Sequence, residues 1–449
     1  MNNLYSQNHI EKLEYELLPI AVINLSSEQI TRAAKISEQI SNLSRRWQTY
    51  INNLALDAFV EWLQERADNL KINQNGCTVL NPALANAIPV VANLQVDKFR
   101  ICLIPIGILD LDTVTVPQVV IDIPEYIPHF YVLVQVLEEQ GSAIISGFLS
   151  YQELMTNRGE TNLNPATDWN YELSVSWFDS EPNNLLLYLR CLKPQAITLP
   201  TVPQNRHQIL LTMESELSAL LPHLQSPQRE LWEVLTWEQG TAVLTHSDLL
   251  QWIYNSQKQT PDSVHKTNWK DLFKLCTQPA VNVGRWLWDE LDELAQQLSW
   301  NLLPTLTPAI VMRSPTEELQ VIIQQLQNQG LEIPSQARGA YQDFILAGIS
   351  LRLYAITWYL LSDTDAHLWS LLLVLGTTSE STLPRDLKLR VSDKNSVLLE
   401  KGINQQQGNA YLFTRLIGHW DEKFLVSVIL MDGVEVNLPP FTFHLSNLA

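Results

Sequence analysis

The sequence is poor in cysteine, glycine and charged residues, and each shortage excludes a class of protein. Only four cysteines occur in 449 residues, and none lies near another, so a disulfide scaffold is excluded and reduced thiols are expected. There are 15 glycines, with neither a G-x-x-x-x-G-K-[ST] nor a G-x-G-x-x-G pattern, so no phosphate-cradling loop is expected. Charged residues make up 17%, which makes the chain polar mainly through Asn, Gln, Ser and Thr.

Positive charge is the scarcer sign. Lys and Arg number 29 against 48 Asp and Glu, which gives a formal net charge of −19. A surface of this charge repels phosphate backbones and anionic lipid headgroups. We therefore expect neither nucleic acid nor a membrane surface as a partner, and a protein partner fits better.

No targeting or membrane-spanning segment is expected. Residues Met1–Asn8 contain neither a basic nor an apolar run, so a signal peptide is not indicated there. The longest apolar run, Phe344 to Leu361, has Arg352 in its middle, which would cost about 2.5–3.5 kcal/mol in a bilayer. This run is predicted to be buried β-strand. Together with the reduced thiols, these observations predict a cytoplasmic location.

Signatures of catalysis and metal binding are also missing. There is no G-x-S-x-G and no H-E-x-x-H, and the nine histidines are dispersed singly. Asp110 and Asp112 fall in a predicted turn, and the acidic run Asp289–Glu293 on a solvated helix face, where carboxyl groups lack the burial that catalysis needs. Cys276 follows an apolar helical run and is predicted to be a buried, inert thiol. No catalytic residue, metal ligand or cofactor is therefore predicted.

Apolar patterning predicts an α+β chain. Hydrophobic residues make up 46%, and 14 tryptophans supply large core side chains. Four segments are predicted: an N-terminal helical segment at 1–75, a small β-barrel-like module at 76–195, a helical segment at 204–332, and a C-terminal antiparallel β-sandwich-like domain at 336–449.

The N-terminal pattern is specific in detail. Ser26 and Gln29 form a capping-box pattern, and the apolar spacing beyond them predicts one long helix or two consecutive ones to about Arg66. Three β-type runs follow within Val116–Leu154, and the middle one, Tyr131–Leu137, is apolar on both faces, so it should be a central strand. Alternation over Tyr171–Phe178, with a return over 185–192, predicts a β-hairpin.

The rest of the chain changes from a helical to a β pattern. Beyond a proline-rich linker at 194–205, the apolar spacing predicts helices, and the last of them should end at Gly330. From Arg338 onward, short apolar and alternating runs predict strands of a sandwich or barrel. The predicted helices cover 209–221, 228–237, 247–254, 286–298 and 317–329.

A series of short motifs resembles a cyanobacterial family, domain-of-unknown-function family 1822. The motifs are Ile104-Pro105 with Asp110, Val116-Pro117-Gln118, Asp122-Ile123-Pro124, Tyr131 with Val134-Gln135-Val136, Gly147-Phe148, Gln152-Glu153-Leu154, Gly418 to Phe424, and Leu438-Pro439-Pro440-Phe441. The family usually has Trp at the position of Val120. The resemblance implies no established activity and no catalytic residues. It implies a regulatory role, because similar proteins tend to be encoded near sigma factors and caspase-like signalling proteins, which become candidate partners.

One loop is a candidate binding site. His419, Trp420, Asp421 and Glu422 form a polar and aromatic connection between two predicted strands. Loops on rigid scaffolds carry function disproportionately, so these four residues are predicted to bind a partner. The alternative is a plain hairpin connection in which Trp420 covers the edge of the sheet.

The sequence as a whole predicts a non-catalytic cytoplasmic interaction or regulatory protein that binds another protein. One alternative is an enzyme whose site is assembled from distant residues, which would show a deep pocket with convergent polar groups. A second is a sugar- or peptide-binding module in the C-terminal β domain. That module would need exposed aromatic rings among Trp358, Trp369 and Trp420.

Overall fold

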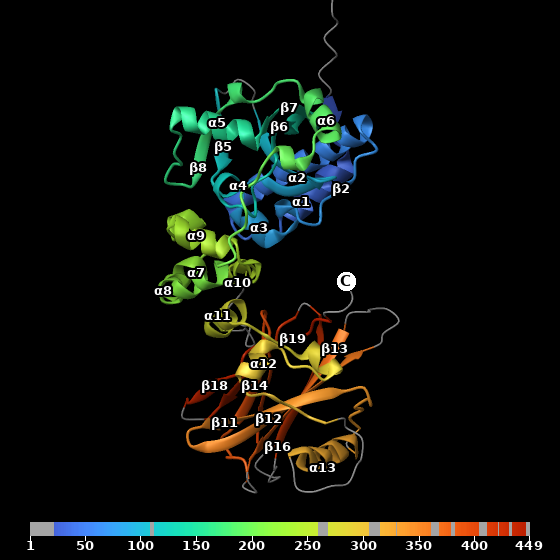
Figure 1. The fold of residues 1–449 in the computed structure, drawn as a ribbon. Coiled ribbons are helices and arrows are strands. Elements are labelled where there is room, and N and C mark those ends of the chain that lie inside the picture. The colour runs from blue at the N-terminus through green and yellow to red at the C-terminus, as the bar shows by residue number, and fades with distance from the viewer. Residues whose placement is uncertain are drawn as a thin grey trace, which may run out of the picture. The chain divides into compact units, whose positions relative to one another are not determined.

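The computed structural model places the chain in the α+β class and divides it into two compact units, which are considered separately (Figure 1). Unit 1 comprises Met1–Val202 and Pro227–Trp237, and unit 2 comprises Pro203–Ser226 and Glu238–Ala449. The structure describes residues 22–107, 112–258, 268–304, 315–328, 330–360, 368–378, 382–403, 411–420, 422–430 and 433–445.

Unit 1 is built on a six-stranded sheet with the order β1-β7-β6-β4-β3-β2. Strand β6 is buried along nearly its whole length and pairs with β4 in parallel and with β7 antiparallel, which confirms the predicted central strand. The strands are β1 (Val22–Asn24), β2 (Ile72–Asn73), β3 (Val91–Val96), β4 (Phe99–Ile106), β6 (Phe130–Leu137) and β7 (Ser142–Ser150).

Two consecutive helices precede this sheet. Helix α1 (Ser27–Ser37) begins with the predicted capping box, in which Ser26 and Gln29 satisfy each other's backbone N–H groups. Asn42 then caps the start of α2 (Leu43–Arg66). Helix α2 packs its apolar side chains, Leu54, Phe59 and Trp62 among them, onto one face of the sheet. This packing accounts for burial on one face of β6.

The other face of the sheet carries a smaller layer. Here β5 (Thr113–Pro117) and β8 (Asn170–Ser174) form an antiparallel pair beside α4 (Val119–Asp122) and α5 (Tyr151–Thr161). The buried Tyr131 hydroxyl on β6 donates to the Val120 carbonyl of α4 at 2.7 Å. The remaining helical elements of unit 1 are α3 (Pro82–Ala87), α6 (Pro182–Cys191) and five 3-10 turns at Thr78–Leu80, Glu138–Gln140, Val175–Trp177, Pro194–Ala196 and Leu231–Glu233.

Two predictions in this unit are wrong. The hairpin does not form, because β8 pairs with β5 and residues 185–192 lie largely in α6. Pro182 starts that helix, and Leu185, Leu186 and Leu189 are buried along one side of it. From the sequence alone, so short an apolar run fits a strand as well as a helix. The β-type runs of the Val116–Leu154 stretch are also interrupted, by α4 and by the start of α5.

Unit 2 begins with a group of short helices. They are α7 (Arg206–Thr212), α8 (Glu214–Leu224), α9 (Trp237–Leu244), α10 (Ser247–Lys258) and α11 (Trp269–Thr277). A helix was predicted over 228–237, but only the 3-10 turn at Leu231–Glu233 forms there before α9 begins. The segment instead places Glu230 against Arg45, with an Nη2–Oε2 distance of 2.6 Å, and that ion pair holds it in unit 1.

The helix predicted over 286–298 is also wrong. A 3-10 segment at Val283–Trp288 ends at Asp289, whose φ of 58° is left-handed, and α12 (Glu293–Gln297) starts separately with Asp292 as its N-cap. The break lets Trp286 pack against Trp300, with ring centroids 5.5 Å apart, which a continuous helix would not favour.

A β-sandwich completes unit 2, as the sequence predicts. A five-stranded sheet, β10-β11-β12-β13-β16, faces a four-stranded sheet, β15-β14-β17-β18, across a shared apolar core. Its strands are β10 (Asn301–Leu302), β11 (Arg338–Leu346), β12 (Ile349–Leu360), β13 (Leu368–Thr377), β14 (Lys388–Ser392), β15 (Val397–Gly402), β16 (Tyr411–His419), β17 (Leu425–Ile429) and β18 (Glu435–Asn437), and β9 (Val281–Asn282) pairs with β19 (Phe441–Thr442).

The outer face of the five-stranded sheet is covered by α13 (Pro315–Asn328), as Figure 1 shows. Leu319, Ile323 and Leu326 of this helix pack against outward-facing side chains of β12 and β13, including Trp358 and Leu372. The predicted last helix is therefore confirmed. The Phe344–Leu361 run is strand at 344–346 and 349–360, but a turn at Ala347–Gly348 divides it into two antiparallel strands and Ile345 is 69% exposed, so the prediction of buried strand is correct only in part.

Gly147, a residue of the motif series, lies where another backbone approaches β7. A Cβ atom added to Gly147 would lie 2.8 Å from the carbonyl oxygen of Asp179, whereas one added to Gly159 in α5 would meet nothing within 4 Å. Gly147→Ala should therefore lower the free energy of unfolding by about 1–3 kcal/mol. Gly159→Ala should raise it by up to about 1 kcal/mol, because alanine favours helix. Urea unfolding of both variants checks this, and equal effects would contradict it.

His129 joins β4 to the start of β6 and should make the stability of unit 1 depend on pH. Its Nδ1 accepts the backbone N–H of Arg100 at 2.9 Å, and burial, with the charge of Arg100, lowers the pKa of its imidazole from 6.5 to about 4. Between these two values the unfolded chain binds a proton that the folded chain does not, so stability should fall as the pH is lowered through this window.

In His129→Gln the amide oxygen can still accept the Arg100 N–H, but it does not titrate. As the pH is lowered from 7 to 4.5, the free energy of unfolding of the wild type should therefore decrease more than that of His129→Gln. Urea unfolding at several pH values measures the shift, with His419→Gln as the exposed control. A difference that stays constant with pH would contradict the assignment.

Candidate functional site

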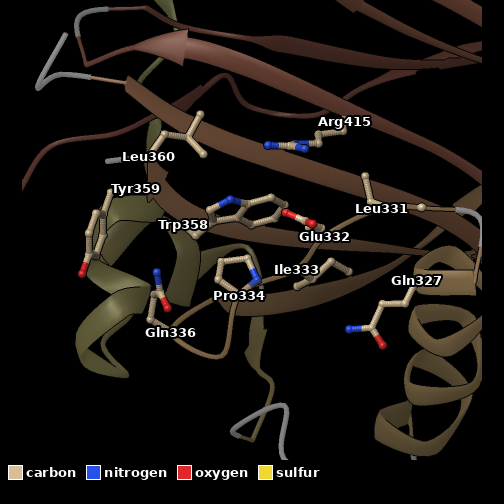
Figure 2. A pocket seen from close by; sticks show the side chains of 11 residues that line it. Gln327, Leu331, Glu332, Ile333, Pro334, Gln336, Trp358, Tyr359, Leu360 and Arg415 are labelled. Carbon is tan, nitrogen blue, oxygen red and sulfur yellow. The ribbon is translucent and has the colours of Figure 1, made fainter. Parts of the chain in front are cut away.

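A cavity of about 680 Å³ lies on the outer face of the five-stranded sheet, in unit 2. Figure 2 shows side chains from three parts of the chain around it: the end of α13 with the segment after it, the end of β12, and β16. The lining residues are Gln327, Gly330, Leu331, Glu332, Ile333, Pro334, Gln336, Trp358, Tyr359, Leu360 and Arg415.

The sheet register places an arginine and a tryptophan together in this cavity. Trp358 of β12 pairs with Ser370 of β13, and Leu372, two residues on, pairs with Arg415 of β16. Residues paired across a sheet, and residues two apart in a strand, point to the same face. Trp358, Ser370 and Arg415 therefore all project outward, toward α13.

Arg415 is held at two points. Its Nε donates to the Ser370 hydroxyl at 2.9 Å, and its guanidinium carbon lies 5.1 Å from the centre of the Trp358 ring. The Ser370 hydroxyl in turn donates to the Leu416 carbonyl at 3.2 Å, and Ser370 is fully buried. A cation stacked on an indole and tied through Nε has a fixed direction, so the guanidinium is oriented before any ligand arrives.

The walls of the cavity combine apolar and polar groups. Leu331, Ile333 and Pro334 supply apolar contacts from the segment after α13, whereas Glu332 and Gln336 of the same segment supply a carboxylate and an amide (Figure 2). With the amide of Gln327 and the phenol of Tyr359, the lining can hold a ligand by directed hydrogen bonds over an apolar base.

The charge around this cavity differs from that of the whole chain. Residues 315–449, which include α13 and the lining segment, contain nine Lys and Arg and fourteen Asp and Glu, a formal charge of −5, whereas the whole chain carries −19. This part of the chain is therefore less negative than the rest, and an anion is repelled from it less strongly.

The predicted binding loop does not line this cavity. The backbone N–H of His419 donates to Glu422 Oε2 at 2.8 Å, and its carbonyl accepts the Trp369 indole N–H at 2.8 Å. Trp420 is half-buried and packs near Phe443, while Asp421 lies outside the described residues. The loop connects β16 of the five-stranded sheet to β17 of the four-stranded sheet, so it is not a hairpin, and its Trp420 packs against the sandwich core. A binding role for this loop stays a prediction.

The sequence reasoning missed Arg415, although a signal was present. In β16 the residues Leu412, Thr414 and Leu416 alternate with Phe413, Arg415 and Ile417, so a single arginine interrupts an otherwise apolar face. Trp358 was considered only as an exposed ring for sugar or peptide binding, and Glu332 gave no signal, because the two residues reach the cavity through sheet pairing and through the course of the chain after α13.

A second cavity, of about 520 Å³, lies in unit 1 against α1 and α2. Its one arginine, Arg32, pairs with the buried Asp57, and Glu28 and Glu61 line the same space. Burial raises the pKa of the Asp57 carboxyl, and the charge of Arg32 opposes that shift. Because its cation is already paired with a carboxylate, this cavity is a weaker candidate for binding an external group.

The other sequence candidates have structural roles where the structure describes them. Cys276 is buried, as predicted, and burial raises the pKa of its thiol to about 12, which favours an unreactive thiol. Asp289 pairs with Arg338 at 3.2 Å, and Asp292 caps α12, whereas Asp110 lies outside the described residues.

Within the described ranges no cluster of three His, Cys, Asp or Glu side chains could hold a metal ion. None of the helices in these ranges is long and apolar enough to cross a bilayer.

Unit 1 also contains a polar cluster on the face of its sheet opposite α2. Arg158 donates to Asp122 Oδ1 at 2.7 Å and to the Tyr171 hydroxyl at 2.6 Å, and that hydroxyl donates to Asp122 Oδ2 at 2.8 Å. Gln118 adds a bond to Asp122 Oδ2 at 2.9 Å. Burial, together with the Asp122 carboxylate, raises the pKa of the Tyr171 hydroxyl, so it remains a donor.

Comparison with known proteins identifies the family. The model of the family described as a protein of unknown function (DUF1822) matches residues 23–438, which is most of both units. The chain belongs to the DUF1822 family. A comparison with curated proteins gives no match. Gln118 and Asp122, which belong to the motif series of the sequence analysis, are the residues that the polar cluster joins to Arg158 and Tyr171. Their place indicates a structural role in fixing the layer of α4, α5 and β8.

Tyr171→Phe in this DUF1822 chain tests that structural role. The change leaves the ring but removes a buried hydroxyl bonded to a carboxylate and a guanidinium, and hydrogen bonds to charged groups contribute about 1.5–3 kcal/mol each. We expect Tyr171→Phe to decrease the free energy of unfolding by about 1.5–3 kcal/mol. Tyr188→Phe, at an exposed ring, should change it by less than about 0.5 kcal/mol. Urea unfolding gives both values, and a neutral Tyr171→Phe would contradict a structural role.

Proposed function

We propose that this protein is a non-catalytic regulatory protein of cyanobacterial origin that acts in the cytoplasm by binding another protein in the Arg415 cavity. The observation that carries the proposal is the oriented guanidinium of Arg415, fixed by Ser370 and Trp358 over an apolar base. The family resemblance suggests a sigma factor or a caspase-like signalling protein as the partner.

The composition of the cavity favours binding over catalysis. Its lining offers amides, an arginine, a phenol and one carboxylate, Glu332. Acid–base catalysis pairs two titratable groups whose environments drive their pKa values apart, and nucleophilic catalysis sets a nucleophile beside a base. The described lining residues supply hydrogen-bonding groups suited to holding a ligand in one orientation.

The alternative of a sugar-binding module is less well supported by the same residues. Sugar recognition by aromatic residues needs an exposed ring face, but Trp358 is 2% exposed and lies under Arg415, and Trp369 is fully buried. Trp420 is half-buried against the sandwich core. A segment of a protein, which brings both apolar groups and backbone amides, suits the lining better.

A photo-crosslinking amino acid at Gln336, an exposed lining residue, tests the proposal. In the native host lysate the Gln336 position should give one dominant protein adduct, identified by mass spectrometry. The control is the same amino acid at Ile345, which is 69% exposed on the same sheet face but far along β11 from the cavity, and it should not give this adduct. The proposal fails if the two positions yield the same adducts.

A further inference from the structure

We infer that the Arg415 cavity binds the carboxylate of an acidic side chain in an extended segment of the partner protein. This inference rests on the proposed function and names the chemistry of the group that is recognised. Arg415, supported by the Trp358 ring beneath it, supplies the charged hydrogen bonds. Leu331, Ile333 and Pro334 contact the adjoining part of the segment, and Glu332 receives an N–H of the segment.

The free edge of the guanidinium points to a carboxylate. Arg415 uses Nε for the Ser370 hydroxyl at 2.9 Å, which leaves the two Nη groups as a planar pair of donors. Such a pair matches the two oxygens of a carboxylate, in a geometry that a lysine ammonium cannot reproduce. Because Ser370 and Trp358 already fix the side chain, little rotamer entropy is lost when the ligand binds.

Arg415 differs from the other half-buried arginines of the same sheets. Arg338, Arg352 and Arg390 each have a carboxylate partner, at 3.2 Å to Asp289, 2.6 Å to Asp343 and 2.8 Å to Glu435 respectively. Over the ranges that the structure describes, no carboxylate forms an ion pair with Arg415. Because Arg415 is half-buried and, unlike these three arginines, has no carboxylate partner among the described residues, it can pair with an anionic group of a ligand.

The remaining lining residues favour a peptide over an inorganic anion. Glu332 lines the cavity without pairing with Arg415, so a ligand must offer a donor to one carboxylate while offering an acceptor to one guanidinium. A peptide segment with an acidic side chain does both, through its backbone N–H groups and its carboxylate. The amides of Gln327 and Gln336 can pair with further backbone groups. A phosphate dianion would bring two negative charges beside Glu332 with only one arginine to meet them.

The experiment is a selection with a random heptapeptide phage library against the intact purified chain, followed by fluorescence anisotropy with labelled copies of the enriched peptides. We expect enriched peptides to share an Asp or Glu. Their affinity should fall roughly tenfold or more for Arg415→Gln. It should fall by a smaller factor for Arg415→Lys, which keeps the positive charge but lacks the planar pair of N–H donors. Arg385→Gln removes the same charge at an exposed position and should change affinity by less than about twofold.

A thermodynamic cycle separates direct contact from damage to the fold. Replacing the acidic residue of the peptide by its amide should weaken binding to the wild type by a factor similar to that of Arg415→Gln, and should have little further effect in that variant. Far-ultraviolet circular dichroism and urea midpoints confirm that each variant folds. Independent, additive losses would overturn the inference, as would enriched peptides that lack acidic residues or a selection that enriches nothing.

Two further outcomes have a defined meaning. If free glutarate competes at the concentration at which the peptide binds, the site takes a small carboxylate and the peptide inference is wrong. If a specific Gln336 crosslink forms equally well in an Arg415→Gln background, the cavity binds a protein partner without using Arg415. That result would support the proposed function and contradict the carboxylate inference. If no specific Gln336 crosslink forms and no peptide is enriched, both the proposed function and the inference are wrong.

Discussion

The continuous register of β12, β13 and β16 is the constraint on which the C-terminal half depends. The pairing runs without a bulge from Leu351 to Leu360 on β12 and across β13 to β16. A slip of one residue would exchange the two faces of a strand, so that Arg415 would enter the sandwich core and Leu416 would face α13. The same register that buries Leu371 and Leu373 between the sheets therefore places Arg415, Ser370 and Trp358 on the opposite face.

Covering that second face creates the cavity. Helix α13 packs over one part of the sheet through Leu319, Ile323 and Leu326, and the chain after it runs over the rest with Leu331 to Pro334. A helix and a short segment do not fill the surface as evenly as a second sheet would, and the space left between them holds the guanidinium. In unit 1 the corresponding second layer, α4, α5 and β8, is joined through the Asp122 and Arg158 cluster. In unit 1 the layer that covers the sheet contains a cluster in which Asp122 and Arg158 pair with each other. In unit 2 the layer of α13 and the segment after it leaves Arg415 oriented but without a carboxylate partner among the described residues.

Sequence reasoning succeeded where local patterning and tertiary packing agree. The capping box at Ser26, the central strand β6 and the sandwich strands follow from spacing alone, and the structure confirms them. It failed where short apolar runs fit both periods, as at Leu185–Leu189 in α6, and where packing interrupts a helical pattern, as at Asp289. The cavity could not be predicted, because Trp358 and Arg415 are 57 positions apart and meet only through β13. Within the described part of the predicted loop, the structure shows a connection between the two sheets of the sandwich, held by His419 contacts to Glu422 and Trp369.

A crystal structure of the intact chain with an enriched acidic peptide would show whether Arg415 binds a carboxylate in the orientation that Ser370 and Trp358 give it. We expect both carboxylate oxygens at about 2.7–2.9 Å from the two Nη atoms of Arg415, with Nε still bonded to Ser370 and the guanidinium still over Trp358. A backbone N–H of the peptide should donate to Glu332. A peptide bound elsewhere, or an Arg415 that leaves Trp358 to reach its ligand, would contradict a cavity oriented in advance for a carboxylate.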